Sequence, residues 1–498
     1  MLKTYIAFFC CLAIFNTRAQ EKRLKIIHAD NTYVDEIKYP GATILSGNVK
    51  VAHQGIIVTC KKAIQYKRKN KLNAIGNVII NQGDSIIQRS QYATYFANKK
   101  LAVSWGNVNL TDSKVRLLTD TLNFDRNKQI LYYLNSGTII DSVNTLKSKV
   151  GNYNLESKKF IAQNNVVLVN PNYTLTSNHL DYYTNSKVAF LYGPSTIKGK
   201  ESTVYSERGF YNTVTDIAHF IKNAKIIGKT QTIEGDSIYY NKKSGFSSAT
   251  GNVVVTDSIN KTITTGGYAE NYEKNDSSFI TKRPVAIIIN KKDSLFLRAD
   301  TLLIVGKNKQ RILKAFHHVK FYKSDMQGKC DSIVSKDSIG LTSMYKNPIL
   351  WANTSQITGH IIHFTRNTET KKLDSLKVLN NSLIVQKDSA GYNQIKGRRI
   401  LGKFTDNDLR DVDVIGNSEV LYYVRDDNHK LIGINKSTSS SIQFKLKNGD
   451  IQTVKFINAP DGITYPLSKL PKNARLLRGF IWRGNERPKT KLDIYRKE

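Results

Sequence analysis

Two pairs of histidines have spacings that could suggest a metal site. His360 and His363 are three residues apart, and His317 and His318 are adjacent. On a β-strand, side chains one or three positions apart point to opposite faces, so neither pair would converge on one ion. No cysteine or carboxylate cluster completes a ligand shell around them. We therefore predict no metal site and no cofactor.

Aspartate also recurs at one place in successive stretches of the chain. The recurring residues are Asp30, Asp120, Asp236, Asp300 and Asp331. Stacked, they could form a ladder that binds cations, but we favour their role as turn-formers that accept backbone N–H bonds. A catalytic carboxylate pair would be singular rather than periodic. The chain also has no nucleophile elbow, phosphate loop or dinucleotide fingerprint, so we predict that it is not an enzyme.

The four cysteines do not form a disulfide framework. Cys10 and Cys11 lie in the predicted signal peptide described below, which leaves Cys60 and Cys330. We predict that these two are semi-buried thiols in strands, and a bridge across many repeats is the alternative.

A Gly-Asn-Val phrase organises the rest of the chain. It begins at Gly47, Gly76, Gly106 and Gly251, with a Gly-Asn-Ser variant at Gly416. Degenerate copies bring the total to thirteen marks at steps of 28 to 36 residues. The degenerate copies begin at Ser136, Asn164, Gly193, Asn223, Arg283, His317, Asn347 and Asn380. Such spacing predicts a repeat protein whose stacked units share one core.

Apolar residues spaced two apart precede each mark. Residues two apart share one face of a strand, so we predict that these residues line one apolar inner wall. The predicted wall residues are Leu122, Phe124, Leu180, Tyr182, Ile238, Tyr240, Leu302 and Ile304. Residues that alternate with them should lie on the opposite face, and these are Asn123, Asp181, Tyr239 and Leu303.

A basic turn lies between each apolar phrase and its mark. Stacking would align these turns along one edge, and much of the formal net charge of +35 lies there. The edge residues are Lys67, Arg68, Lys69, Lys71, Lys99, Lys100, Lys158, Lys159, Lys242 and Lys243. They either keep the edge soluble or meet an anionic partner such as phosphorylated lipid headgroups. Nucleic acid is excluded as a partner, because we expect the protein to be exported.

The Gly-Asn pair itself predicts a local change of backbone direction. Glycine and asparagine tolerate positive φ, which a tight hairpin requires. A glycine inside a strand can instead form a bulge that turns a sheet around a corner. Both alternatives give antiparallel β structure. In both, the motif shapes the backbone and takes no part in catalysis or ligand binding.

The N-terminus has the pattern of a targeting segment. An apolar run from Tyr5 to Phe15 follows Lys3, and a small-residue exit lies near Ala19. The run is too short to span a bilayer, so we predict a signal peptide over residues 1–19. Residues 20–435 would form the repeat domain, with two consecutive jellyroll modules as one option. Residues 436–498, where serine and proline interrupt the rhythm, would form a C-terminal cap.

These features resemble the OstA-like family of periplasmic lipopolysaccharide-transport proteins, related to LptA and to the N-terminal domain of LptD. The resemblance rests on the repeated phrase after a signal peptide, and it is strongest at 44–110 and 230–256. It implies an all-β, elongated, open β-jellyroll, V-shaped with two antiparallel sheets, built from about thirteen repeats of ~30 residues.

The resemblance also implies a function. The apolar cleft would shield the acyl chains of lipopolysaccharide or a related glycolipid during outer-membrane biogenesis. The implied partners are other lipopolysaccharide-transport components, with head-to-tail self-association as an option. The implied location is the periplasm, with association with the inner face of the outer membrane as a further option.

Two other functional classes share parts of this pattern. A structural or adhesive β-solenoid on the cell surface would have the same repeats and signal, but its apolar residues would fill a closed core. A β-helix enzyme that processes polysaccharide would need a singular acidic cluster, which the sequence lacks. An open or a filled interior therefore separates the first two classes.

Overall fold

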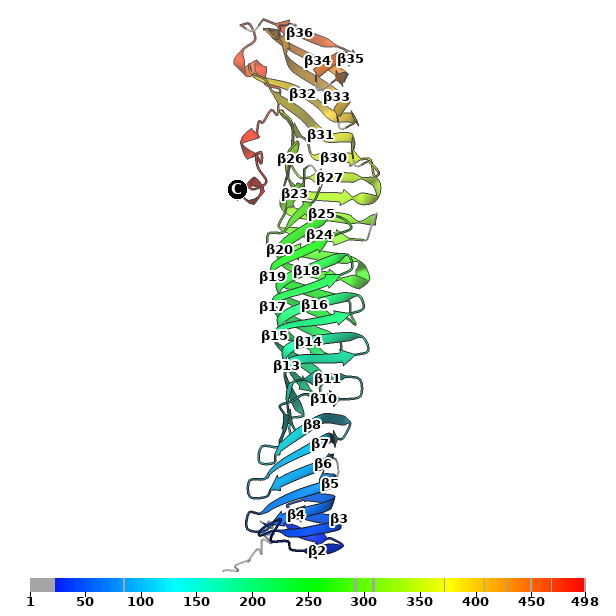
Figure 1. Cartoon of the computed structure of the whole chain (residues 1–498). Helices are drawn as coiled ribbons and strands as arrows, with labels where there is room; N and C mark the ends of the chain where they lie inside the picture. Colours follow the sequence, from blue (N-terminus) through cyan, green and yellow to red (C-terminus); the bar gives the residue numbers. More distant parts are fainter. Residues whose placement is uncertain are drawn as a thin grey trace, which may run out of the picture. The chain divides into compact units, whose positions relative to one another are not determined.

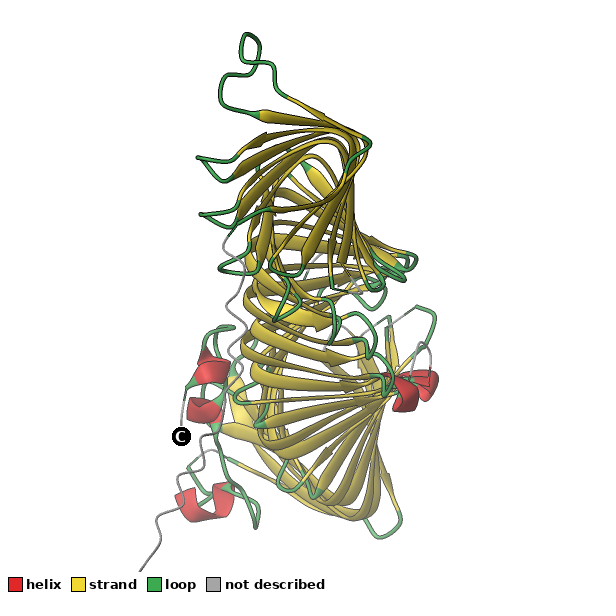
Figure 2. Cartoon of the chain, turned by 90° about the horizontal axis from the view of Figure 1, so that it is seen from below, coloured by secondary structure: helices red, strands yellow, loops and turns green. Residues whose placement is uncertain are grey.

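The computed structural model describes residues 23–496 apart from 84–85, 291–292, 307–309, 371, 407, 427, 448–449 and 467. The predicted signal peptide lies outside the described residues. The chain divides into two compact units, residues 1–200 and 201–498. Each unit consists of antiparallel strands (Figures 1 and 2), which confirms the predicted all-β class.

Unit 1 (residues 1–200) contains strands β1 to β15 (Figure 1). Their bounds are β1 Lys25–His28, β2 Asn31–Tyr33, β3 Thr43–His53, β4 Ile56–Tyr66, β5 Lys71–Gln82, β6 Ile86–Phe96, β7 Leu101–Asp112, β8 Val115–Asp125, β9 Ile130–Tyr133, β10 Gly137–Ile140, β11 Thr145–Ser148, β12 Val150–Asn154, β13 Lys159–Asn170, β14 Tyr173–Tyr183 and β15 Val188–Gly199.

Unit 2 (residues 201–498) contains strands β16 to β36 and a few short 3-10 turns. The strand bounds are β16 Ser202–Asn212, β17 Ile217–Gly228, β18 Gln231–Asn241, β19 Phe246–Asp257, β20 Thr262–Tyr272, β21 Ser277–Thr281, β22 Val285–Ile288, β23 Leu295–Arg298, β24 Thr301–Val305, β25 Ile312–Lys323, β26 Met326–Lys336, β27 Leu341–Tyr345, β28 Ile349–Ala352, β29 Ser355–Thr358, β30 Ile361–Arg366, β31 Leu373–Lys387, β32 Tyr392–Thr405, β33 Asp408–Arg425, β34 Leu431–Lys447, β35 Asp450–Ile457 and β36 Asp461–Tyr465. The turns are η1 Glu273–Asn275, η3 Asp337–Ile339, η4 Lys472–Arg475, η5 Gly484–Glu486 and η6 Asp493–Tyr495.

The Gly-Asn marks are bulges inside long strands, not hairpin turns. Between β5 and β6, Ile75 pairs with Tyr92 and Val78 pairs with Ser90, so Gly76 and Asn77 together oppose one residue. Both have positive φ, 77° and 48°. A bulge of this kind bends its strand, so two halves of the same strand form the two walls (Figure 2).

The degenerate marks keep the same backbone geometry with other residues. Consecutive positive-φ pairs stand at Asn164–Asn165, Lys222–Asn223, Lys282–Arg283, His317–His318 and Asn380–Asn381. Asparagine is among the non-glycine residues that tolerate this region best. The repeated feature is therefore a two-residue left-handed bend, of which Gly-Asn is the least strained form.

Four-residue turns stack along one edge of unit 1, which we call the turn edge. The turns are 67–70, 97–100, 126–129, 155–158 and 184–187. The backbone carbonyl that ends each turn accepts a hydrogen bond from the amide that begins the next, as from Ala97 to Asn70 (2.9 Å) and from Thr184 to Lys158 (3.0 Å). The turns 54–55, 113–114, 141–144 and 171–172 lie at the opposite strand ends, which we call the hairpin edge.

The sheet of unit 2 continues past residue 436, where the sequence predicts the start of a cap. Strand β34 crosses this position and pairs with both β35 and β36. The chain leaves the sheet at Pro466, and residues 466–496 then run back along unit 2. Figure 1 shows this segment, in red, beside β26 and β23.

Candidate functional site

The predicted wall residues of unit 1 lie inside the bent sheet. Leu122, Phe124, Leu180 and Tyr182 are all buried. Leu180 faces Ala162 and Leu191 on the neighbouring strands, and both of these are also buried. Successive side chains of a strand point to opposite faces, so every second residue of these strands adds to one continuous apolar interior.

The interior of unit 1 is filled by its own side chains. Tyr133, Tyr153 and Phe160 are fully buried, as are leucines on successive strands. Tyr133 occupies the space beside Gly137 and Gly151, where an added Cβ would collide with its ring. Apolar groups from another molecule could enter this interior only if its two edges moved apart.

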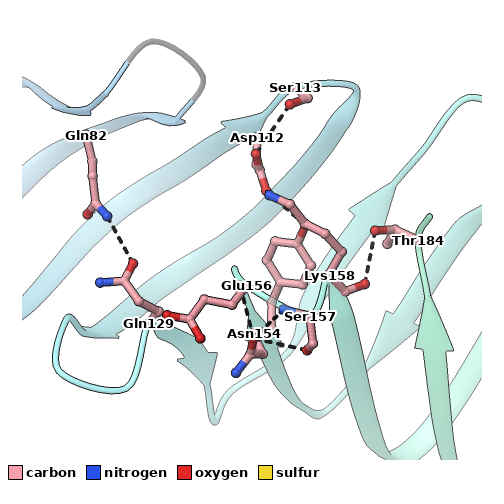
Figure 3. A network of polar contacts seen from close by, with 10 residues as sticks. Gln82, Asp112, Ser113, Gln129, Asn154, Glu156, Ser157, Lys158 and Thr184 are labelled. Carbon is pink, nitrogen blue, oxygen red and sulfur yellow. Dashed lines mark hydrogen bonds and ion pairs between the residues drawn. The ribbon is translucent and has the colours of Figure 1, made fainter.

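A row of polar contacts, which we call the clasp, joins the two edges of unit 1. Its four links are Gln54 O with Arg126 (2.9 Å), Gln82 with Gln129 (3.0 Å), Asp112 with Lys158 (2.5 Å) and Asp141 with Lys187 (2.9 Å). Each link joins the hairpin edge to the turn edge. Figure 3 shows Gln82 facing Gln129, and Asp112 beside Lys158.

Buried tyrosines reinforce the clasp. The Tyr153 hydroxyl donates to Asp112 (2.9 Å), and the Tyr182 hydroxyl donates to Asp141 (2.6 Å). Burial, together with the charge and hydrogen bond of Asp112, raises the pKa of Tyr153 far above its ordinary value. Tyr153 therefore stays protonated, and both carboxylates have partners inside the unit.

Hydrogen bonds decide the charge of Asp141. Burial alone would raise its pKa, but donors on Tyr182, Lys187 and the amides of Val143 and Asn144 hold the pKa at about 2. Asp141 is thus ionised at neutral pH. Because the unfolded value is about 3.9, ionised Asp141 stabilises the fold above about pH 4, and this contribution is lost as the pH falls towards 2.

The first prediction concerns this pH window. We expect Asp141→Asn to lower the free energy of unfolding of the chain by about 2 kcal/mol at pH 6. The difference from the parent should shrink below pH 4 and vanish near pH 2. Denaturant unfolding across this pH range measures it, with exposed Asp120→Asn as the matched control. A difference that does not change with pH would contradict the role of Asp141.

Unit 2 holds a cavity between its bent walls. Its volume is about 390 Å³, within the range of about 300–1,000 Å³ that holds small ligands. Two predicted wall residues, Ile238 and Ile304, line it together with Ile233, Val255 and Ile280. The other two wall residues of this unit, Leu302 and Tyr240, are buried and half-buried. Half-buried Ile304 thus borders free space here, whereas Ile238 lines the cavity but is only 1% exposed.

The charged residues around this cavity are mostly acidic. Asp257, Glu270, Glu273 and Asp276 line it with one arginine, Arg311. Burial opposes ionisation of Asp257, but hydrogen bonds from Asn260 and Gln231 and the charge of Arg311 hold its pKa below the ordinary value. Carboxylates repel phosphate, so the cavity suits the apolar part of a ligand rather than an anionic headgroup.

The predicted basic edge coincides with the turn edge. Lys67, Arg68, Lys69 and Lys99 are exposed in unit 1, and Lys242 and Lys243 are exposed in unit 2. Lys71 and Lys100 are half-buried. Lys158 and Lys159 are half-buried and bind Asp112 and Asp181 (2.7 Å), so they serve the fold itself. Asp181 lies on the outer face, as its place in the alternation predicts.

The recurring aspartates lie at the bends. Asp30 accepts a hydrogen bond from the Asn48 side chain (3.1 Å), and Asp236 accepts one from Asn252 (3.1 Å). Asp300 binds His318 (2.7 Å), and Asp331 binds His317 (3.1 Å). Asp30, Asp236 and Asp300 therefore hold the second residue of a bend and Asp331 holds the first, through side chains rather than the backbone N–H groups expected from the sequence.

The two histidine pairs do not come together around a common point. His360 lies beside Asn381 at a bend, whereas His363 bonds Ser343 on β27 (2.7 Å). Within the described part of the chain, no cluster of three or more His, Cys, Asp or Glu side chains could hold a metal ion.

A cavity of about 780 Å³ at the bend of unit 1 is lined mainly by polar residues, including Asp120, Lys147 and Lys149.

Cys60 and Cys330 are free thiols in buried strand positions. Cys60 belongs to unit 1 and Cys330 to unit 2. Burial raises the pKa of Cys60, and it raises the pKa of Cys330 to about 12. Neither thiol is therefore activated as a nucleophile at neutral pH.

The repeated bends, the apolar interior and the stacked turns can now be compared with known proteins. The model of the family described as OstA-like protein matches residues 21–178 and 164–236. These residues belong to the OstA-like family. The match confirms the family resemblance of the repeats, and it covers all of described unit 1 and the first strands of unit 2.

One solved structure similar to part of this chain is LptH of Pseudomonas aeruginosa. It is described as the LptA homologous periplasmic component of the conserved lipopolysaccharide transport device. The similarity covers 29% of this chain and 99% of LptH, at 13% identity and a TM-score of 0.22. A search among curated proteins finds no match. In the described part of the chain, no helix has the length and apolarity needed to cross a membrane.

The clasp of unit 1 was not predicted from the sequence. Its links join residues 46 to 72 positions apart in the chain, for example Asp112 with Lys158 and Gln54 with Arg126. The signal is present as a polar residue at the end of the strand before each hairpin, for example His53, Gln82 and Asp112. Gly228 stands at the corresponding end of β17 and has no side chain to form such a link.

Proposed function

We propose that this OstA-like chain binds lipopolysaccharide or a related glycolipid and shields its acyl chains between the bent walls during outer-membrane biogenesis. The observation that carries the proposal is the cavity of unit 2, which lies between bent walls and is lined by Ile238 and Ile304. The preceding repeats, residues 21–236, match the OstA-like family. The function is binding and transfer, without catalysis.

The energetics favour entry at unit 2 before unit 1. Separating Asp141 from Lys187 and its other donors loses the stability that ionised Asp141 contributes, about 2 kcal/mol. Burying an acyl chain gains about 0.8 kcal/mol per methylene, so about two to three methylenes offset one link of the clasp. An acyl chain could thus open unit 1 link by link, whereas the cavity of unit 2 needs no such opening.

The headgroup phosphates would lie at the turn edge. The acidic rim of the cavity excludes them, and exposed Lys67, Arg68 and Lys69 offer the opposite charge. We place the protein in the periplasm, with the inner face of the outer membrane as its site of action. Other lipopolysaccharide-transport components would be its partners, and copies could join head to tail.

Binding of purified lipopolysaccharide to the purified full chain tests the proposal. We expect Lys67→Gln, Arg68→Gln and Lys69→Gln together to weaken binding at low salt while the stability stays unchanged, because exposed charges contribute little to folding. The loss should shrink as salt rises, since the Debye length falls to about 8 Å at physiological ionic strength. If the parent does not bind lipopolysaccharide, the proposed function is wrong. If the variant binds lipopolysaccharide as well as the parent at low salt, Lys67, Arg68 and Lys69 serve only to keep the protein soluble.

A structural or adhesive β-solenoid is the second candidate function. The filled interior of unit 1, closed by the clasp, is the observation that favours it. Under this alternative the clasp would never open, and lipopolysaccharide would not be found inside either unit.

A further inference from the structure

The C-terminal segment, residues 466–496, is held against the outer face of unit 2 by buried glutamines. Gln394 donates to Arg475 O (2.9 Å) and accepts from the Leu477 amide (2.8 Å). Gln356 donates to Ile481 O (2.7 Å) and accepts from the Arg483 amide (2.7 Å). Both glutamines are fully buried, so each has its amide group satisfied by the segment's backbone. We call this segment the strap.

Two further positions extend this attachment towards the chain end. Gln327 accepts from Arg487 (2.6 Å), and Arg298 donates to Ile494 O (2.8 Å). The strap also packs its apolar side against the sheet, where Leu470 and Leu477 join a buried cluster with Leu421. One side of the strap is therefore attached to the sheet of unit 2 by hydrogen bonds and apolar contacts.

The other side of the strap exposes large apolar residues. Leu476 is 45% exposed, Ile481 62%, Leu492 67% and Tyr495 49%. Leu476, Ile481 and Leu492 lie among buried anchors such as Leu477, Pro488 and Ile494, so they face away from the sheet, whereas the Tyr495 ring lies 6.0 Å from the Arg298 guanidinium on β23. Burial against unit 2 does not account for these three aliphatic residues.

Basic residues alternate with these apolar residues. Residues 466–496 contain nine Lys and Arg against two acidic residues, a formal charge of +7. Lys472, Arg478 and Lys489 are exposed. Both acids are already neutralised, Glu486 by Arg483 and Lys329, and Asp493 by Arg496. The exposed side of the strap thus combines positive charge with aliphatic groups.

We propose that the strap is a membrane-binding strip that docks on an anionic lipid surface. Such a surface attracts Lys and Arg to its phosphates and takes apolar side chains into the headgroup boundary. An acidic protein would match the charge alone, without a place for Ile481 and Leu492. The proposal uses the proposed periplasmic location only to bring the chain to a membrane, and it is independent of the ligand in the interior.

Vesicle binding by the full chain tests this proposal. We expect the chain to sediment with phosphatidylcholine vesicles that contain phosphatidylglycerol, and not with phosphatidylcholine alone. Removing the apolar groups (Leu476→Ser, Ile481→Ser, Leu492→Ser) should weaken binding about tenfold. Removing the charges (Lys472→Gln, Arg478→Gln, Lys489→Gln) should also weaken it about tenfold.

A matched control separates the strap from the net charge of the chain. Lys387, Lys403 and Lys445 are exposed on unit 2 outside the strap, and replacing all three with Gln changes the charge by the same amount. We expect this control to bind vesicles like the parent. No binding by the parent, or equal weakening in the control, would overturn the proposal. Lipopolysaccharide binding in solution should be the same in all these variants, so that a failure of the proposed function would be seen separately.

Discussion

The substitution Gly151→Val is expected to lower the free energy of unfolding of unit 1 by about 3 kcal/mol, because it overfills a close-packed interior. Gly151 faces Tyr133, and an added Cβ would collide with the ring. Tyr133 is fully buried and its hydroxyl bonds Ser148 (2.8 Å), so the ring has no free space to occupy. Denaturant unfolding followed by circular dichroism measures the change.

The neighbouring residue supplies the control. Asn152 lies on the same strand, half-buried on the opposite face. Valine suits strands, so Asn152→Val should change stability by less than about 0.5 kcal/mol. Similar losses at both positions would mean that the interior near Tyr133 is not tightly filled.

Locking the clasp is expected to abolish capture of lipid inside unit 1. Gln82 and Gln129 contact each other across the two edges, so Gln82→Cys with Gln129→Cys allows a bifunctional maleimide to join them. Cys60 and Cys330 are buried with raised pKa, so they should react slowly. A photo-crosslinker at Leu122, inside unit 1, should then fall to background capture of lipopolysaccharide.

Two controls accompany this experiment. A monofunctional maleimide on the same cysteines should leave capture at Leu122 unchanged. Capture at Ile238 in the cavity of unit 2 should persist after locking, because that cavity lies outside the clasp. Undiminished capture at Leu122 in the locked protein would show that lipid reaches unit 1 without opening it.

The local features of the fold could be predicted from the sequence because they repeat. Positive-φ residues at the bends, apolar residues two apart and basic turns each leave a periodic trace, and their positions agree with the structure. The choice between hairpin and bulge could not be made, because glycine and asparagine serve both geometries. The strand register decides it, and register depends on pairing between strands.

The contacts that close or cover the units were less predictable. The clasp joins Asp141 to Lys187, and the strap joins Arg298 to Ile494, so both depend on where bent strands bring distant residues. Residues 436–498 were expected to form a cap because serine and proline interrupt the repeats there. That pattern could not show that β34 to β36 extend the sheet as far as Tyr465 before the chain leaves it.

The most direct measurement of the central claim is site-specific photo-crosslinking in the cell envelope. A crosslinker at Ile238 or Ile304 would point into the cavity of unit 2, whereas one at Tyr239 or Leu303 would point to the opposite face. The account predicts lipopolysaccharide adducts at the first two positions and few at the second two. Equal capture at all four positions, or none at Ile238 and Ile304, would contradict it.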